Sequence, residues 1–239
     1  MNSKKTRFVP AYKDGKFQCS VHEAQESFFQ FACRTTSMLI KSSLARLIPR
    51  CREHIDWYAP VGHVKRSQNL IITWIGHSTL LIQVGGINIL TDPIFGNSSP
   101  LYPRIMRPGI MLDQLPPIDC VLISHNHIDH METASLKILA QQAGISFFVP
   151  FGDKAWFDKR SIGRTVENLW WDSHVLKSPD TTSHATFTFL PAVHWTQRWI
   201  NDKNCSLWGS WMIECNGNVV YFGGDTAYGS HFKVIAQEF

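Results

Sequence analysis

An α/β fold is predicted for this sequence of 239 residues by three observations. First, glycines separate three consecutive runs rich in apolar and β-branched residues, which is typical of antiparallel strands joined by tight turns: Leu70–Trp74, Thr79–Val84 and Ile87–Thr91. Second, Cys120–Ser124 has the composition of a short buried strand. Third, Ala134–Ala143 has the apolar spacing of a helix and ends before Gly144, a residue type that commonly terminates helices.

Further elements are expected along the rest of the chain. Short apolar runs predict four more strands, at Ser146–Val149, Thr186–Leu190, Ser210–Cys215 and Val219–Phe222. Short helices are expected near Lys154–Phe157 and after Tyr228.

Two regions are distinguished by composition. Residues 1–68 are predicted to form a basic N-terminal extension, because many of the 23 Lys and Arg residues lie there, and residues 69–239 are predicted to form one domain. A helix is expected through Ala24–Leu47, where it either packs on the domain or lies on an anionic membrane surface. Aromatic and basic residues are not interleaved as in a nucleic-acid-binding module, so no nucleic-acid partner is expected.

Composition narrows the class of protein. Hydrophobic residues make up 44% and charged residues 18%, as in globular proteins with a substantial core. The six Cys residues include no Cys-x-x-Cys pair, which argues against a disulfide framework and favours a reducing compartment such as the cytoplasm. Because no apolar run reaches the roughly 18 to 20 residues that span a bilayer, we expect a protein that is soluble or peripheral at a membrane.

Side chains that bind metals are concentrated directly after the predicted strand Cys120–Ser124. Four of the next six residues are of this type: His125, His127, Asp129 and His130. With 11 His in 239 residues, three specified His positions would match by chance roughly once in ten thousand starts. Imidazole and carboxylate ligands suit zinc, although iron and manganese accept the same set. His194 and Asp225, which each follow a predicted strand, are further candidate ligands.

Together with their surroundings, these residues resemble the metallo-β-lactamase superfamily. The matching motifs are Thr73–Thr79, Leu90–Phe95, the His-x-His-x-Asp-His run, Pro191-x-x-His194-Trp195, Trp208–Trp211 and Gly224-Asp225-Thr226. The most similar branch contains N-acylphosphatidylethanolamine-hydrolysing phospholipase D and its bacterial relatives, and ascorbate-6-phosphate lactonase is similar more loosely. The resemblance implies a four-layer αββα sandwich.

The resemblance also implies roles for individual residues. His125, His127 and His194 would hold one ion, Asp129 and His130 a second, and Asp225 would bridge the two, which gives two zinc ions per chain. A hydroxide between the ions would be the nucleophile, so that Asp129 and Asp225 take part in catalysis as well as in metal binding.

Four residues near these motifs are candidates for supporting roles. Asp92 would accept a hydrogen bond from a ligand histidine and fix its tautomer, or else it is a residue of an Asp-Pro turn. His77 is expected near the metal cleft, where it supports a ligand from behind, takes part in loop hydrogen bonding, or binds a metal ion directly. Trp195 and Arg198 would form a wall of the substrate site, with Arg198 donating to a phosphate, or else they serve packing and surface charge.

The C-terminal end differs from the family pattern. Members of the family carry one more histidine ligand of the second ion downstream of the Gly-Asp-Thr motif, whereas this sequence ends at Phe239 without a histidine in a matching motif. We therefore expect the C-terminal part of the sandwich to be missing and the second metal site to be weakened. The uncovered sheet would favour association with another chain, so an oligomer is an open alternative.

The expected function is hydrolysis of a phosphodiester in the manner of a phospholipase D, with an N-acylphosphatidylethanolamine-like lipid or a small phosphodiester as substrate. A lactonase, in which the same hydroxide attacks a carbonyl, is one alternative. A metal-binding fragment with impaired catalysis is another. A redox diiron protein is the most distant alternative, because no flavin-binding module is attached.

Overall fold

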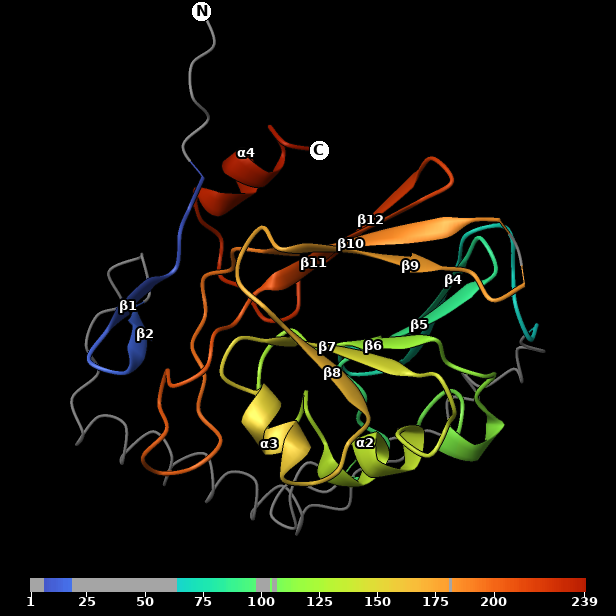
Figure 1. Ribbon diagram of the computed structural model, residues 1–239, viewed down its shortest axis with the longest axis horizontal. Helices are drawn as coiled ribbons and strands as arrows, with labels where there is room; N and C mark the ends of the chain where they lie inside the picture. Colours follow the sequence, from blue (N-terminus) through green and yellow to red (C-terminus); the bar gives the residue numbers. More distant parts are fainter. Residues whose placement is uncertain (1–6, 19–63, 98–103, 105–106, 181) are drawn as a thin grey trace, which may run out of the picture. The chain divides into compact units, whose positions relative to one another are not determined.

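Two β-sheets form the framework of the protein in a computed structural model, which describes residues 7–18, 64–97, 104, 107–180 and 182–239 (Figure 1). The larger sheet has six strands in the order of the sequence: β3 (Ile71–Gly76), β4 (Thr79–Val84), β5 (Ile87–Thr91), β6 (Cys120–Leu122), β7 (Ser146–Pro150) and β8 (Arg164–Asn168). Strands β3 to β5 pair antiparallel, and β5 to β8 pair parallel. The sheet is therefore mixed.

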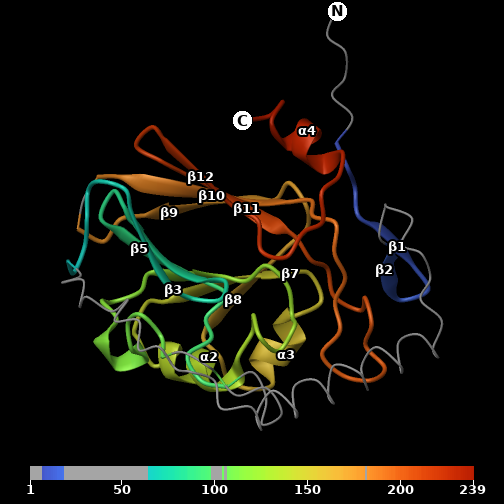
Figure 2. The ribbon, with the colours of Figure 1, turned by 180° about the vertical axis from the view of Figure 1, so that it is seen from behind.

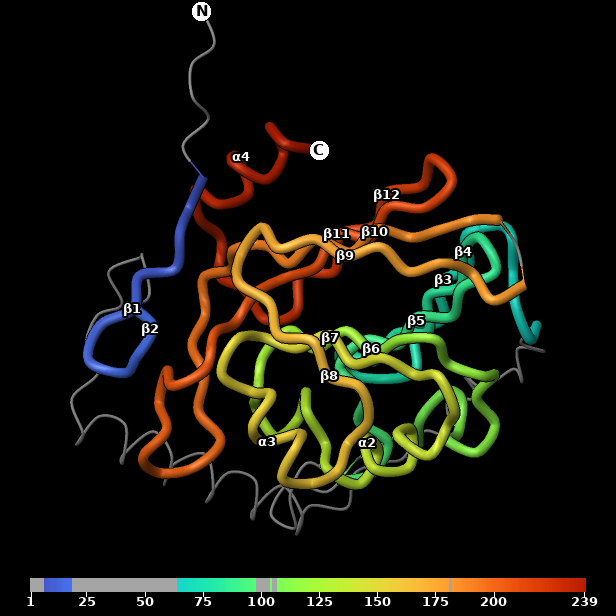
Figure 3. The backbone as a smooth tube through the Cα atoms, in the orientation of Figure 1, coloured from blue at the N-terminus to red at the C-terminus, as the bar shows by residue number. Residues whose placement is uncertain are grey.

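The smaller sheet has four antiparallel strands in the order β12-β11-β10-β9. Its strands are β9 (Ser173–Lys177), β10 (His184–Leu190), β11 (Ser210–Cys215) and β12 (Asn218–Phe222). The tube in Figure 3 shows the chain leaving the larger sheet after β8 and building this second sheet from consecutive strands.

Helices cover the larger sheet on the face turned away from the smaller one. Both views show α2 (Thr133–Leu139) and α3 (Lys154–Asp158) on that face (Figures 1 and 2). A 3-10 helix, η1, covers Leu112–Gln114. The last helix, α4 (His231–Ile235), packs through Ile235 on Leu190 and Met212 of the smaller sheet. One short helix therefore also packs on the smaller sheet.

The two hydrophobic cores follow from the alternation of side chains along the strands. In β4, Ile82 packs in the core between the sheets, whereas its neighbour Leu81 packs in the core beneath the helices. Phe187 and Phe189 of β10 face the first core, and Leu136 of α2 and Phe157 of α3 fill the second. Because the larger sheet is covered on both faces, strands β4 and β5 are buried at nearly every position.

The strands and helices predicted from Leu70 onward are all present within a few residues of their expected bounds. Strands β8 and β9 were not predicted. Both lie at a sheet edge, and polar residues interrupt their apolar pattern, so that pairing with β7 and β10 rather than local composition defines them.

Part of the predicted N-terminal extension contacts the domain. A hairpin of β1 (Ala11–Lys13) and β2 (Lys16–Gln18) buries Phe17 in the core between the sheets. The indole Nε1 of Trp171 donates to the Phe8 carbonyl at 2.7 Å, and Arg7 forms an ion pair with Glu238 at 2.9 Å. All described residues belong to one compact unit. The helix predicted at Ala24–Leu47 lies outside the described residues, and the domain boundary at residue 69 stays a prediction.

Helices within the described ranges are all too short or too polar to cross a bilayer.

Candidate metal centre

The candidate ligands are held in loops at the ends of strands from both sheets. His125 to His130 follow β6, Asp92 follows β5, His194 follows β10 and Asp225 follows β12. Two buried tryptophans donate hydrogen bonds to the backbone beside these loops. The indole of Trp211 donates to the Ile123 carbonyl at 2.9 Å, and the indole of Trp208 donates to the Ala192 carbonyl at 3.0 Å. The Trp-Gly-Ser-Trp motif thus braces the chain beside two ligand loops.

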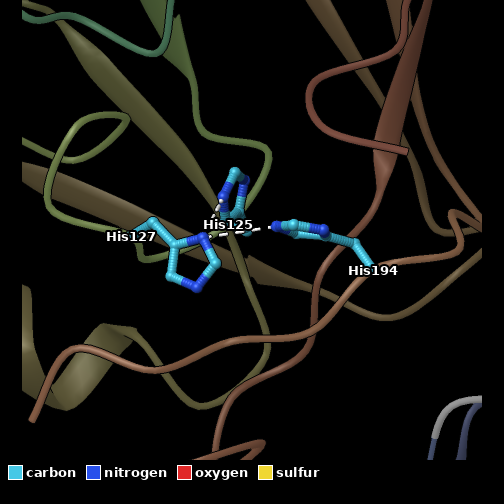
Figure 4. Close-up of side chains that lie close together, drawn as sticks. All are labelled: His125, His127 and His194. Atoms are coloured by element: carbon cyan, nitrogen blue, oxygen red, sulfur yellow. Dashed lines mark hydrogen bonds between the residues drawn. The ribbon is translucent and has the colours of Figure 1, made fainter. Parts of the chain in front are cut away.

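Three histidine rings form the first group and point toward one another (Figure 4). The Nδ1 atom of His127 lies 2.8 Å from Nε2 of His125 and 3.3 Å from Nε2 of His194. Tetrahedral ligands of one zinc ion lie about 3.4 Å apart when each metal–nitrogen bond is about 2.1 Å. The distance between the His127 and His194 nitrogens is therefore close to that of two ligands of one cation, and the distance between the His127 and His125 nitrogens is shorter.

The donor set of this group fits a cation better than it fits mutual hydrogen bonding. The His127 Nδ1 atom faces two ring nitrogens, and one proton there satisfies only one of the two contacts. Burial is the main cause that lowers the pKa of His127 to about 4, and burial likewise lowers the pKa values of His125 and His194. At neutral pH the three rings are uncharged and have lone pairs available for a metal.

The second group consists of His77, Asp129 and His130, with ligand atoms within 4.8 Å of one another. The Nε2 atom of His77 lies 3.1 Å from Nε2 of His130 and 3.4 Å from Oδ2 of Asp129. The Oδ2 atom of Asp225 lies 3.4 Å from His130 Nε2 and 3.9 Å from His194 Nε2. Asp225 is therefore placed between the two groups.

A fully buried carboxylate, Asp92, contacts the second group directly and reaches the first group through Ser124. Its Oδ2 atom accepts a hydrogen bond from Nδ1 of His130 at 2.8 Å and one from the Ser124 hydroxyl at 2.6 Å. The Ser124 oxygen in turn lies 2.9 Å from Nδ1 of His125. The second nitrogen of each ring, Nε2, is left facing the other candidate ligands. Ser124 has no motif signal of its own, and its position between the strand and His125 is the only hint in the sequence.

Asp129 of the second group and the neighbouring Asp225 are ionised at neutral pH. Burial opposes ionisation of Asp129, but a hydrogen bond from His77 and the charge of His130 outweigh it and lower its pKa to about 2. A hydrogen bond from His130 is the main cause that lowers the pKa of Asp225. Burial also works against the charged form of His130, yet its contacts with Asp225 and Asp92 raise its pKa to about 10. The metal-free ring is therefore charged at neutral pH and would release a proton on binding an ion.

A glycine allows the Asp225 loop to approach the His-rich loop. Gly224 has φ +56°, and a Cβ atom built on it would lie 2.5 Å from the Cβ of Ser124. Only a residue without a side chain fits there.

The two predicted substrate contacts, Trp195 and Arg198, lie on the loop that follows β10. The Trp195 ring meets the His127 ring edge to face, with centroids 4.5 Å apart. The guanidinium of Arg198 donates to the Asn126 carbonyl and to the Thr133 hydroxyl, at 3.1 and 3.2 Å. Trp195 thus adjoins the first group, whereas Arg198 braces the His-rich loop with two of its nitrogens.

A buried polar cluster behind the His-rich loop was not anticipated from the sequence. The amide of Asn126 donates to Asp153 at 3.2 Å and to the Ser206 hydroxyl at 2.7 Å. Asp153 directly follows the turn after β7, and one of its carboxylate oxygens is buried without a hydrogen-bond partner among the described residues. A lone Asp in a Gly-Asp turn carries no signal that distinguishes it from an exposed one.

The two sheets with helices outside them, together with two groups of histidine and carboxylate ligands at the strand ends, define the class as a metallo-hydrolase fold. The model of the Beta-lactamase superfamily domain matches residues 87–239. The chain therefore belongs to the metallo-β-lactamase superfamily, within the branch similar to N-acylphosphatidylethanolamine-hydrolysing phospholipase D.

Individual relatives agree with this placement. The chain is 30% identical over 219 residues to N-acyl-phosphatidylethanolamine-hydrolyzing phospholipase D 1 of Caenorhabditis elegans, a match that covers 84% of this chain and 61% of the worm protein. It is 34% identical over 161 residues to the mitochondrial N-acyl-phosphatidylethanolamine-hydrolyzing phospholipase D of Saccharomyces cerevisiae, covering 65% of this chain and 34% of the yeast protein. The chain thus spans about three fifths of the worm relative and about a third of the yeast one.

A solved structure shares the fold. Igni18, a metallo hydrolase of the archaeon Ignicoccus hospitalis, superposes with a TM-score of 0.54 at 21% identity, over 71% of this chain and 66% of that one.

Proposed function

We propose that this protein is a metal-dependent hydrolase that cleaves phosphodiester bonds in N-acylphosphatidylethanolamine-like lipids. The observation that carries the proposal is the position of Asp225 Oδ2, which lies 3.4 Å from a nitrogen of one ligand group and 3.9 Å from a nitrogen of the other. A carboxylate oxygen between two such groups suits a bridge between two cations, which is the arrangement used by enzymes that displace groups at phosphorus.

The proposed ligands of the first ion are His125, His127 and His194. Asp129 and His130 are proposed for the second ion, with Asp225 shared between the two. Two divalent ions bound there, for which zinc is our proposal, would supply an activated water and stabilise the negative charge that develops at phosphorus. Asp129 and Asp225 are the carboxylates that water and substrate can reach, since each side chain is 43% exposed. They are proposed to orient the attacking water by accepting its hydrogen bonds.

A lipid substrate is supported by exposed apolar side chains next to the ligands in the sequence. Ile128 lies inside the His-rich loop, Trp199 and Ile200 follow His194, and Tyr228 follows Asp225. Exposed apolar groups around a polar site are typical of surfaces that bind acyl chains or a membrane. The names of the worm and yeast relatives point to the same substrate class. Trp195, beside His127, is our proposed wall of the substrate site.

Hydrolysis assays on the zinc-loaded chain test the proposal. An N-acylphosphatidylethanolamine in mixed micelles and a chromogenic phosphodiester should both be cleaved, and the His127→Ala variant should lose at least about 100-fold in rate because it removes a ligand. The His184→Ala variant, in an exposed position at the start of β10, is the matched control and should keep its activity.

Other outcomes would favour the alternatives. Turnover of a lactone without turnover of either phosphodiester would indicate lactonase chemistry. A chain that binds two ions but hydrolyses none of these substrates would contradict the proposal and favour a non-catalytic metal-binding protein. Elemental analysis of the purified protein would distinguish zinc from iron or manganese.

A further inference from the structure

We propose that His77 is a direct ligand of the second ion, an inference that rests on the two-ion site proposed above. His77 lies in the turn between β3 and β4, whereas Asp129 and His130 follow β6. Its Nε2 atom is 3.1 Å from His130 Nε2 and 3.4 Å from Asp129 Oδ2. Both distances are close to the spacing of about 3.4 Å expected between ligands of one tetrahedral ion. Together with Asp225, the set supplies four protein ligands.

The contacts around His130 favour a shared cation over a direct hydrogen bond between the two rings. His130 gives its Nδ1 hydrogen to Asp92 at 2.8 Å, so its remaining nitrogen, Nε2, faces His77 and Asp225 together. One hydrogen on that nitrogen satisfies one of these two neighbours. A cation between them would accept a lone pair from every one of the facing atoms.

The backbone holds His77 in an uncommon conformation. Its φ of +51° lies in the left-handed region, which few residues other than glycine adopt. Two hydrogen bonds stabilise the turn. The Trp74 indole donates to the His77 carbonyl at 2.8 Å, and the Thr91 hydroxyl donates to the Ser78 carbonyl at 2.8 Å. Such conformations persist where the surrounding structure imposes them, and they are concentrated at functional sites.

The side chain is also accessible. His77 is 45% exposed, in contrast to the fully buried ring of His130. The exposed His77 ring lies on the solvent side of the second site. In a variant that lacks this ring, a small molecule could enter from solvent and take its place.

Titration of the metal-free protein with Co²⁺ tests the inference, with visible absorption of the bound ion as a readout that is independent of catalysis. Wild type should bind two ions per chain. In the His77→Ala variant the second ion should bind at least about 10-fold more weakly, as expected for loss of a ligand, while the first ion is unaffected. Added imidazole should restore both the affinity and the absorption of the second ion.

Two further variants serve as controls. His77→Asn retains a residue type that tolerates the left-handed backbone, so it should unfold at the same temperature as wild type yet bind the second ion weakly. His184→Ala removes an exposed histidine of β10 and should bind both ions normally.

The contradicting outcomes are distinct for the two proposals. Unchanged affinity and absorption of the second ion in both His77 variants would overturn the role of His77 and leave the proposed hydrolase intact. Weakened binding that imidazole does not restore would also overturn direct ligation and make His77 a positioning residue. A wild type that takes up no Co²⁺ would contradict the proposed function itself, and the inference with it.

Discussion

The carboxylate of Asp92 accepts a hydrogen bond from Nδ1 of His130 at 2.8 Å, and neither side chain has any exposed surface. The bond determines that the other nitrogen of His130 faces Asp225. Through the Ser124 hydroxyl, the same carboxylate also reaches His125 of the first ligand group. One buried residue therefore orients an imidazole ring in each group, as carboxylates behind metal-ligating histidines commonly do.

Replacing Asp92 by Asn should weaken metal binding by about 10- to 100-fold, because an amide NH₂ can then face the Nδ1 hydrogen of His130 and the ring loses its fixed orientation. Competition with a chromophoric chelator measures the affinity of both ions. Asp158→Asn, which alters an exposed carboxylate paired with Lys154, is the control and should leave affinity unchanged. Equal affinities in Asp92→Asn and wild type would contradict the orienting role.

Gly224→Ala should destabilise the protein more than Gly217→Ala. Both glycines have positive φ, +56° and +74°, so each substitution costs about 1–2 kcal/mol of backbone strain. A Cβ atom at residue 217 meets no atom within 4 Å in the described part of the chain, whereas at residue 224 it overlaps Ser124. The clash should add about 1–3 kcal/mol to the loss in free energy of unfolding. Urea unfolding of the two variants measures the difference, and equal losses would show that the loops separate at little cost.

Asp153 should make stability fall as pH rises from about 4 to about 7. Burial is the main cause that raises its pKa from 3.8 to about 7; Glu167 adds to the increase, while Asn126, Ser206 and Arg198 oppose it. In that pH range the folded protein keeps a proton that the unfolded chain has lost, so the free energy of unfolding decreases with pH.

The Asp153→Asn variant removes this titration. Its stability relative to wild type should increase with pH between about 4 and about 7 and then level off. Urea unfolding of the variant and of wild type at several pH values measures the trend. A flat difference for Asp153→Asn would mean that this carboxyl group titrates normally.

Trp211→Phe should lower both stability and metal affinity. The substitution leaves the buried carbonyl of Ile123 without its indole donor, which costs about 1–3 kcal/mol, and it leaves a cavity in the core between the sheets. Because that carbonyl precedes Ser124 and His125, the ligand loop should loosen as well. Thermal unfolding and Co²⁺ binding measure the two effects. Trp199→Phe, at a site that is 67% exposed, should change neither one.

Local pattern predicts the strands in which most residues are apolar or β-branched and fails for those in which they are not. Thr79–Val84 and Ile87–Thr91 are strands with the predicted bounds, because both faces of the larger sheet are covered and all their residues except Gln83 and Asn88 are apolar or β-branched. Strand β9, Ser173–Lys177, alternates between exposed and half-buried residues at a sheet edge. Strand β9 forms because it pairs with β10, and the composition of neither segment predicts this pairing.

The sequence by itself determined which loop is rich in metal ligands and that His194 and Asp225 each follow a strand, because composition and order along the chain are local properties. Only the tertiary structure decided how they converge. His77 and His130 are 53 residues apart in the sequence, and their nitrogens lie 3.1 Å apart because β3, β4, β5 and β6 pair in order and bring the two turns to one end of the sheet. Which ring nitrogen faces the site likewise depends on Asp92, a partner 38 residues from His130. Such distances are set by strand pairing and packing across the whole fold.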